Sequence, residues 1–239
     1  MKAALCLFGQ PRCLDYVLPR TLKGLFRGEV PDIYVHTWDE VYYRKDQTSF
    51  RADFSKSYDK QELEGQYRAI CGEKLKKIVI DSWRTSELAH HPIFDIGMFY
   101  SIEQSVKFLQ DSGKEYEKVV LTRSDVLIDD PHLSLDFSAD VLHAGYYSSD
   151  YHGFLKDLFF FGNSKVISKF LGIYSFALSY IPPEGGDLNE HKVFAYCRER
   201  GIEFDSTIIP HAIVRPGKTG YEKVIWGRKG LKYVPANLV

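Results

Sequence analysis

A guanidinium group and a carboxylate stand at the end of an apolar run in the middle of the chain. The segment Val119–Asp125 starts with apolar residues and ends in Arg123, Ser124 and Asp125. Side chains alternate across a strand, so Arg123 and Asp125 are expected on one side. A carboxylate there can hold Mn²⁺ or Mg²⁺, which would neutralise a diphosphate leaving group. The same residues also fit a buried Arg123–Asp125 ion pair, or an Asp125 that caps the turn at Asp129–Pro131.

A second polar group follows the first apolar run. Ala3–Phe8 leads directly into Gly9, Gln10, Pro11 and Arg12. Glycine lets the backbone approach a ligand closely, and the planar guanidinium of arginine matches a diphosphate. A Gly-x-Pro sequence also serves ordinary strand-to-helix turns, so both interpretations stay open.

Carboxylates near the start of a C-terminal helix are candidates for a general base. On an expected helix Asp187–Arg200, Glu190 falls on the face that carries Val193 and Cys197, with Asp187 at its edge. Burial without a partner raises the pKa of a carboxyl group and suits it to deprotonate a sugar hydroxyl. Stabilisation of the helix dipole explains acidic residues in a first turn equally well.

Two histidines follow expected strands. His211 can complete a metal site opposite Asp125, and His36 can line a ligand pocket. Each of them also fits a hydrogen-bonded structural role, and sequence distance does not pair them. The segment 146–153 is rich in rings and hydroxyls, which suits a platform for a sugar or an exposed turn.

The elements that must position these residues alternate along the chain. This alternation predicts a single α/β domain over residues 1–239, with a mostly parallel sheet flanked by helices. Strands are expected at Ala3–Phe8, Asp32–Trp38, Leu75–Asp81, Lys118–Val126, Val141–Tyr146, Asp157–Gly162 and Ile202–Ile209. Helices are expected from the first loop through Leu25, over Lys60–Cys71, Asp95–Ser112 and Asp187–Arg200, and from about Lys165. Residues 41–60 are interpreted as a surface loop, and the basic tail after Arg215 receives no assignment.

Composition narrows the class of protein. The net charge is −1 without any long basic stretch, which disfavours nucleic acid as the main partner. The four cysteines form no CxxC pair and indicate a reducing compartment. No stretch is long enough for a signal peptide or a membrane span, so a cytoplasmic protein is expected, with peripheral docking to a membrane left open. The many aromatic rings suit either sugar and base stacking or the core.

Taken in order, these strand-end groups resemble a family of glycosyltransferases of polysaccharide and lipopolysaccharide biosynthesis with a GT-A-type fold, of bacterial or large-virus type. The matching segments span most of the chain: Leu7–Arg12, Val35–Asp39, Tyr100–Ile102, Leu121–Asp125 and Asp157–Gly162. The resemblance implies a nucleotide-diphosphate sugar as donor and a glycan or glycolipid as acceptor. It places the donor against Phe8, Gly9, Gln10, Arg12, Asp39, Arg123 and Ser124.

The resemblance also assigns Asp125 to the metal and the diphosphate, and Asp157 to the acceptor side. Related enzymes carry Asp-x-Asp where this chain has Arg123-Ser124-Asp125. Arg123 can replace part of the charge of an ion, so metal dependence stays open.

The resulting hypothesis is a hexosyl- or pentosyltransferase, with an inverting mechanism favoured. Glu190, then Asp157 or Asp187, would act as the base. One alternative is a sugar-phosphate nucleotidyltransferase, although such enzymes carry a longer, Gly-rich and basic first loop. Another is a non-catalytic module of the same fold that binds carbohydrate or nucleotide.

Overall fold

The structure is a computed structural model. It describes residues 2–26, 29–43, 54–91, 96–128, 140–145, 158–181, 189–207, 211–217, 220–227 and 230–235.

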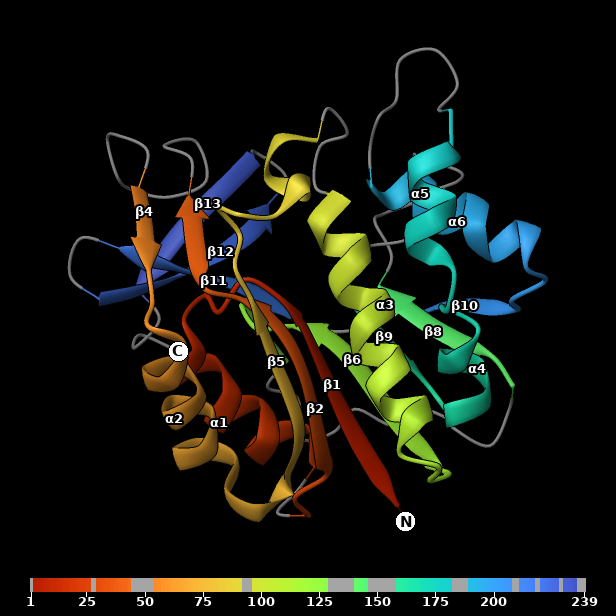
Figure 1. Cartoon of the computed structure of the whole chain (residues 1–239), viewed down its shortest axis with the longest axis horizontal. Coiled ribbons are helices and arrows are strands. Elements are labelled where there is room, and N and C mark those ends of the chain that lie inside the picture. Colours follow the sequence, from red (N-terminus) through yellow and green to blue (C-terminus); the bar gives the residue numbers. More distant parts are fainter. Residues whose placement is uncertain are drawn as a thin grey trace.

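A seven-stranded sheet forms the centre of the molecule (Figure 1). Its strands, in spatial order, are β10 (Phe204–Thr207), β8 (Leu142–Gly145), β9 (Phe159–Gly162), β6 (Lys118–Arg123), β1 (Ala3–Gly9), β2 (Asp32–Trp38) and β5 (Leu75–Asp81). The pairs β5–β2, β2–β1, β1–β6 and β8–β10 are parallel. β9 runs antiparallel to both of its neighbours. The mostly parallel sheet confirms the expected fold class, a Rossmann-like, GT-A-like α/β architecture.

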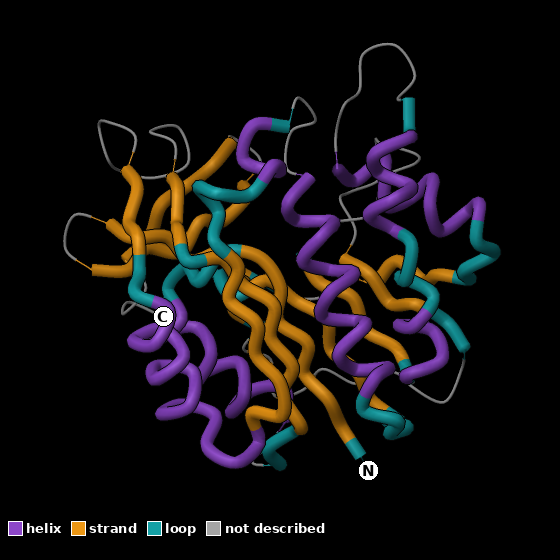
Figure 2. Tube along the Cα trace, in the orientation of Figure 1, coloured by secondary structure: helices purple, strands orange, loops and turns teal. Residues whose placement is uncertain are grey.

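Helices cover both faces of this sheet (Figure 2). One face carries α1 (Leu14–Phe26) and α2 (Lys60–Cys71). The other carries α3 (Ile96–Asp111), α4 (Ser164–Ser168), α5 (Ile173–Ser179) and α6 (Asn189–Glu199). Short 3-10 helices occur at η1 (Gly72–Lys74) and η2 (Glu87–His90).

The continuous apolar run of β1 explains why it lies between these two layers. Leu5 and Leu7 pack into the cluster beneath α1 and α2, while Ala4, Cys6 and Phe8 pack beneath α3. All five side chains are at most 2% exposed. A strand covered on both faces has no need of alternating polarity.

Most element boundaries expected from the sequence agree with the structure, including β2, α2 and β5. Asn163 caps α4 as expected, since its side-chain oxygen accepts a hydrogen bond from the backbone N–H of Val166 at 3.0 Å. The expected strand Lys118–Val126 is wrong beyond Arg123. There the chain leaves the central sheet, and β7 (Val126–Leu127) joins a second sheet.

The described residues after Arg215, which received no assignment from the sequence, form strands of this second sheet. It is antiparallel, with the order β13 (Gly230–Pro235), β12 (Gly220–Gly227), β11 (Ala212–Gly217) and β7. Glycines face each other at the ends of both hairpins, Gly217 with Gly220 and Gly227 with Gly230. Glycine at such ends is typical of tight hairpins. These glycines were therefore a hairpin signal in the sequence, although an expectation of parallel strands does not make use of it.

The stretch expected as a loop contains a further hairpin, β3 (Glu40–Tyr43) paired with β4 (Phe54–Ser57). Val41 is 2% exposed and Tyr42 is 39% exposed. Glu40, two residues before Tyr42 and on the same side of the strand, is only 8% exposed, so polarity and burial do not alternate along β3 and its sequence carries no clear strand signal.

Candidate functional site

The carboxyl ends of β1, β2 and β6 meet at one edge of the central sheet, and a pocket of about 390 Å³ lies there. Ligands of open α/β sheets bind at this edge because the loops that leave parallel strands converge on it. The pocket is lined from several elements by Phe8, Gly9, Gln10, Arg12, Trp38, Tyr42, Trp83, Leu88, Ala89, His91, Ile96, Gly97, Met98, Arg123, Asp125 and Arg215.

Three guanidinium groups surround the carboxylate of Asp125 on one wall. Arg123 donates from Nε to Oδ1 at 2.9 Å and from NH2 to Oδ2 at 2.8 Å. Arg215 donates to Oδ2 as well, and Arg12 reaches the same oxygen at 3.5 Å. Arg123 ends β6, and Asp125 lies in the turn that follows it. Arg215 lies on β11, and Arg12 lies in the loop after β1. The arrangement carries a net charge of +2.

Asp125 is 1% exposed, and its protonation state follows from its neighbours. Burial alone would raise the pKa of its carboxyl group, but the positive charges of Arg123, Arg215 and Arg12 outweigh burial and hold the pKa far below its usual range. Asp125 is therefore an anion at any ordinary pH.

The amide of Gln10 positions Arg12. Its Oε1 accepts from Arg12 Nε at 2.9 Å and from the backbone N–H of Tyr42 at 3.1 Å. Arg12 also donates to the carbonyl oxygen of Tyr42 at 2.8 Å. Gly9 just before has a φ of +89°, a conformation that residues with a Cβ avoid. The first loop therefore has the tight turn expected of it and links Arg12 to β3.

Two tryptophans that line the pocket form an aromatic wall. The rings of Trp38 and Trp83 pack edge to face, with centroids 4.9 Å apart. A Cβ added to Gly97 would lie 2.6 Å from Cζ3 of Trp83, so this position of α3 has no room for a side chain. Asp39 accepts a hydrogen bond from the backbone N–H of Trp83 at 2.9 Å. Asp39, which the sequence predicts at the donor, therefore helps to position Trp83 through this hydrogen bond.

His36 lies behind this wall in a polar network. It is 0% exposed, and its ring nitrogens lie 3.0 Å from Ser101 Oγ and 3.1 Å from Asp81 Oδ2. The phenol of Tyr100 donates to the same oxygen of Asp81 at 3.3 Å. The hydrogen bond with His36 lowers the pKa of Asp81 despite its partial burial. His36 is not among the described residues that line the pocket.

Six residues expected around the donor or the metal do line this pocket: Phe8, Gly9, Gln10, Arg12, Arg123 and Asp125. Ser124 is buried beside them, 3.4 Å from the hydroxyl of Tyr67. The ring of His211 packs edge-on against Phe159, with centroids 4.9 Å apart. Asp157 and Asp187 lie outside the described residues.

Glu190 lies at the edge of the buried face of α6, next to Val193 and Cys197 on the helical wheel. The buried residues of this helix are Asn189, Lys192, Val193, Tyr196 and Cys197. Glu190 is only half-buried and does not belong to the described pocket lining. The buried face also includes Lys192, a residue that polarity alone places outside: it is 1% exposed, with its Nζ 6.0 Å from the centroid of Phe99. Its aliphatic stem allows it to pack there.

The sequence did not single out Arg215, Trp83 or Tyr42, although each lines the pocket. Arg215 lies on a strand that was not foreseen. Trp83 follows the end of β5 by two residues, so the rule that ligands bind beyond strand ends could have found it.

The donor set around Asp125 does not fit a divalent cation. Both of its oxygens accept from guanidinium groups, and those groups would repel a metal ion. Within the described part of the chain, no group of three or more His, Cys, Asp or Glu side chains is placed to hold a metal. None of the described helices is long and apolar enough to cross a bilayer.

No protein-family model and no curated protein matches the chain. Among solved structures, it is similar to the nucleoside-diphosphate-sugar pyrophosphorylase from Vibrio cholerae RC9. The TM-score is 0.43 and the sequence identity is 12%, with 92% of this chain and 93% of that chain covered.

Proposed function

We propose that this protein binds a nucleoside-diphosphate sugar in the pocket at the carboxyl edge of the sheet and transfers the sugar to a hydroxyl group of a glycan. The observation that carries the proposal is the cluster of Arg12, Arg123 and Arg215 around one buried carboxylate. We refer to these four side chains as the arginine cluster.

The chemistry of the arginine cluster suits a diphosphate. Guanidinium groups bind phosphate oxygens through paired, charge-assisted hydrogen bonds. Asp125 cancels only one of three positive charges, so the cluster attracts anions and still keeps its arginines in fixed positions. When the bond between the sugar and the diphosphate breaks, negative charge grows on the leaving oxygen, and preorganised cations stabilise that charge.

The aromatic wall suits the nucleoside. Trp83 of the aromatic wall is half-buried, and Tyr42, which lines the same pocket from β3, is 39% exposed, so both residues keep surface available to a ligand. A flat base stacks on such rings. Together with the arginine cluster, the wall supports a ligand with an aromatic end and a diphosphate.

In this proposal the arginine cluster supplies the positive charge that a metal ion provides in Asp-x-Asp enzymes, so turnover needs no divalent cation. The acceptor hydroxyl must lose a proton as it attacks the anomeric carbon. Glu190, Asp157 and Asp187 remain the candidates for this base, with inversion as the favoured outcome.

A sugar-phosphate nucleotidyltransferase is the second candidate, because a cationic pocket beside an aromatic wall also fits a nucleoside triphosphate. The two reactions differ in what they release. Transfer from a nucleotide sugar releases a nucleoside diphosphate, whereas nucleotidyl transfer to a sugar phosphate releases diphosphate.

The first test is a thermal-unfolding panel of nucleoside diphosphates and nucleotide sugars, each measured with Mn²⁺ and with EDTA. A ligand that binds only the folded protein raises the midpoint with its affinity. We expect one nucleotide family to raise the midpoint equally in both conditions. A shift that needs Mn²⁺ would refute the metal-free role of the arginine cluster, and the absence of any shift would refute the nucleotide site.

The released product then decides the reaction. Release of nucleoside diphosphate in the presence of an acceptor supports transfer, and release of diphosphate from a triphosphate plus sugar phosphate supports the second candidate. Binding without either product would favour a non-catalytic module.

A further inference from the structure

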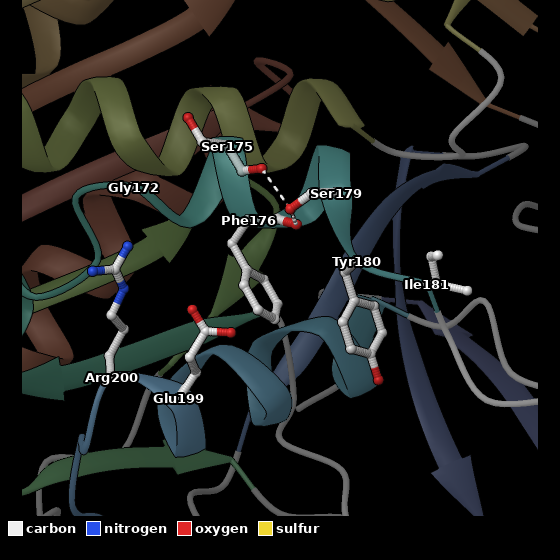
Figure 3. A pocket seen from close by; sticks show the side chains of 8 residues that line it. All are labelled: Gly172, Ser175, Phe176, Ser179, Tyr180, Ile181, Glu199 and Arg200. Atoms are coloured by element: carbon white, nitrogen blue, oxygen red, sulfur yellow. Dashed lines mark hydrogen bonds between the residues drawn. The ribbon is translucent and has the colours of Figure 1, made fainter.

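A second concave surface, the α5–α6 groove, lies away from the arginine cluster. Its volume is about 630 Å³, within the range of small-molecule sites. It is lined by Gly172, Ser175, Phe176, Ser179, Tyr180, Ile181, Glu199 and Arg200. Figure 3 shows the rings of Phe176 and Tyr180 extending from α5 toward α6.

Hydrogen bonds to neighbouring elements fix both walls of the groove, α5 and α6. Glu103 of α3 accepts hydrogen bonds from the backbone N–H groups of Gly172 and Tyr174 at 2.8 and 3.1 Å, which fixes the start of α5. The hydroxyl of Tyr196 on α6 donates to the carbonyl oxygens of Lys169 and Leu171, at 2.7 Å each. Both walls are therefore tied to neighbouring elements.

Arg200 has a defined place at one end of the groove. Its Cζ lies 5.5 Å from the centroid of the Tyr196 ring. A Cβ on Gly172 would lie 3.3 Å from NH2 of Arg200, so the absence of a side chain at Gly172 lets the guanidinium lie close to the backbone. Gly172 also has a φ of +96°, which favours glycine there for a second reason.

Two rings and the 87% exposed Ile181 form the apolar part of the surface. Phe176 and Tyr180 stack with centroids 5.3 Å apart and an interplanar angle of 28°, and both rings remain half-exposed. Exposed hydroxyl, carboxylate and guanidinium groups surround them, from Ser175, Glu199 and Arg200.

This combination matches one class of ligand. A sugar ring has an apolar face of C–H groups that packs on aromatic rings, and a rim of hydroxyls that donate to carboxylates and accept from guanidinium groups. A diphosphate would need an excess of positive charge, whereas Glu199 and Arg200 balance each other. An apolar protein segment would cover the exposed Glu199 and Arg200 without offering either of them a hydrogen-bond partner.

We propose that the α5–α6 groove binds sugar units of the acceptor glycan, away from the unit that receives the transferred sugar. This inference rests on the proposed function. α3 connects the two sites, because its first turn lines the pocket at the arginine cluster and its Glu103 holds α5. A glycan anchored in the groove would keep its growing end close to the donor.

The test is binding of the full chain to a printed array of defined bacterial and plant oligosaccharides. We expect the wild type to bind a set of related glycans. Tyr180→Ala should weaken that binding at least about fivefold because it removes a stacking ring, while Tyr180→Phe should retain it. Arg200→Ala should weaken it as well. Tyr16→Ala, on α1, serves as the matched control, and far-UV circular dichroism checks folding.

Two further comparisons separate this inference from the proposed function. Arg12→Ala should strongly reduce the nucleotide-induced thermal shift and leave array binding intact. Tyr180→Ala should weaken array binding and leave the nucleotide-induced thermal shift intact. If the wild type binds no glycan, or if Tyr180→Ala binds as the wild type does, the groove is not a glycan site. The nucleotide-induced thermal shift, measured on the same preparations, tests the proposed function independently of this result.

Discussion

Asp125 brings three guanidinium groups together at the edge of the sheet, where they would otherwise repel one another. A buried carboxylate without partners is costly, and so is a cluster of like charges. Each therefore stabilises the other. The arrangement still keeps a net positive charge facing the pocket, which a purely structural ion pair would not need. This surplus of charge is the reason to read the arginine cluster as a binding site.

The first prediction concerns affinity. Arg12→Ala removes one charged donor from the arginine cluster, and a hydrogen bond to a charged group contributes about 1.5–3 kcal/mol. We expect nucleoside diphosphate binding to weaken by roughly ten- to a hundredfold. Isothermal titration calorimetry would measure the affinity of the variant and of the wild type for the nucleoside diphosphate. Arg68→Ala, an exposed arginine of α2 paired with Glu64, is the control and should bind like the wild type.

The second prediction concerns stability. Asp125→Asn leaves the three arginines without their anion, and breaking a buried ion pair costs about 3 kcal/mol in free energy of unfolding. Urea unfolding would measure the loss. Asp140→Asn, which breaks an exposed pair with Lys165, should leave the urea midpoint unchanged. Equal effects of the two substitutions would contradict the structural role of Asp125.

The pH dependence of this difference follows from the depressed pKa of Asp125. A carboxyl group whose pKa is lower in the folded state stabilises the protein at pH values above its pKa in the unfolded chain, which is about 3.9 for aspartate. That stabilisation is lost as the pH falls from there through the folded pKa. The difference between wild type and Asp125→Asn should therefore be constant from neutral pH to about 5 and shrink below about 4. A difference that changes between neutrality and pH 5 would contradict this assignment.

Packing between elements, rather than any single residue, shapes the aromatic wall. Trp83 belongs to the segment after β5, Trp38 ends β2, and Gly97 lies in the first turn of α3. The ring of Trp83 fills the space that a side chain at residue 97 would occupy. The width of the pocket is thus set by how closely α3 approaches the ends of these strands.

The third prediction uses this close approach. Gly97→Ala should displace the ring of Trp83, because the new Cβ would lie 2.6 Å from it. Overpacking of this kind costs roughly 1–3 kcal/mol. We expect weaker nucleotide binding and a shift of tryptophan fluorescence.

Gly65→Ala on α2 is the matched control for that substitution, since no atom lies within 4 Å of its added Cβ. It should stabilise the protein by about 0.5–1 kcal/mol through helix propensity alone. Stabilisation by Gly97→Ala as well, with unchanged fluorescence, would show that Trp83 is not held against α3.

The molecule as a whole combines two sheets at its candidate site. The central sheet supplies Arg123 at the end of β6, and the C-terminal sheet supplies Arg215. The two are joined where the backbone N–H of Val214 donates to the carbonyl oxygen of Asp125 at 2.8 Å. The C-terminal sheet also contacts α1, because the hydroxyl of Tyr221 on β12 donates to the carboxylate of Asp15 at 2.5 Å. A complete arginine cluster thus requires both sheets to be folded.

The fourth prediction follows from this connection. Since each sheet depends on the other for buried partners, the chain should unfold in a single transition, as the single domain expected from the sequence would. Differential scanning calorimetry should give a calorimetric enthalpy equal to the van't Hoff enthalpy. Two separate transitions would show that the C-terminal sheet folds on its own, and Arg215 would then be supplied by an independent unit.

Local signals in the sequence determined much of the framework. The apolar runs of β1, β2 and β5 and the amphipathic stripe of α3 predicted their elements because the period of burial is written into the residues themselves. The abrupt change to polar residues after β1 and β6 also located Arg12, Arg123 and Asp125, since strand ends in a parallel sheet converge on one edge. Short strands without a regular alternation of polarity, such as β3, were not predicted.

Only the tertiary structure decided what those residues do. The sequence left Asp125 open between a metal ligand and an ion pair, and the packing of β11 against β7 brought Arg215 to it from 90 positions away. It likewise placed Trp83 against Gly97 and buried Lys192 on α6. Contacts between distant segments depend on the packing of whole elements, and no local period encodes that packing.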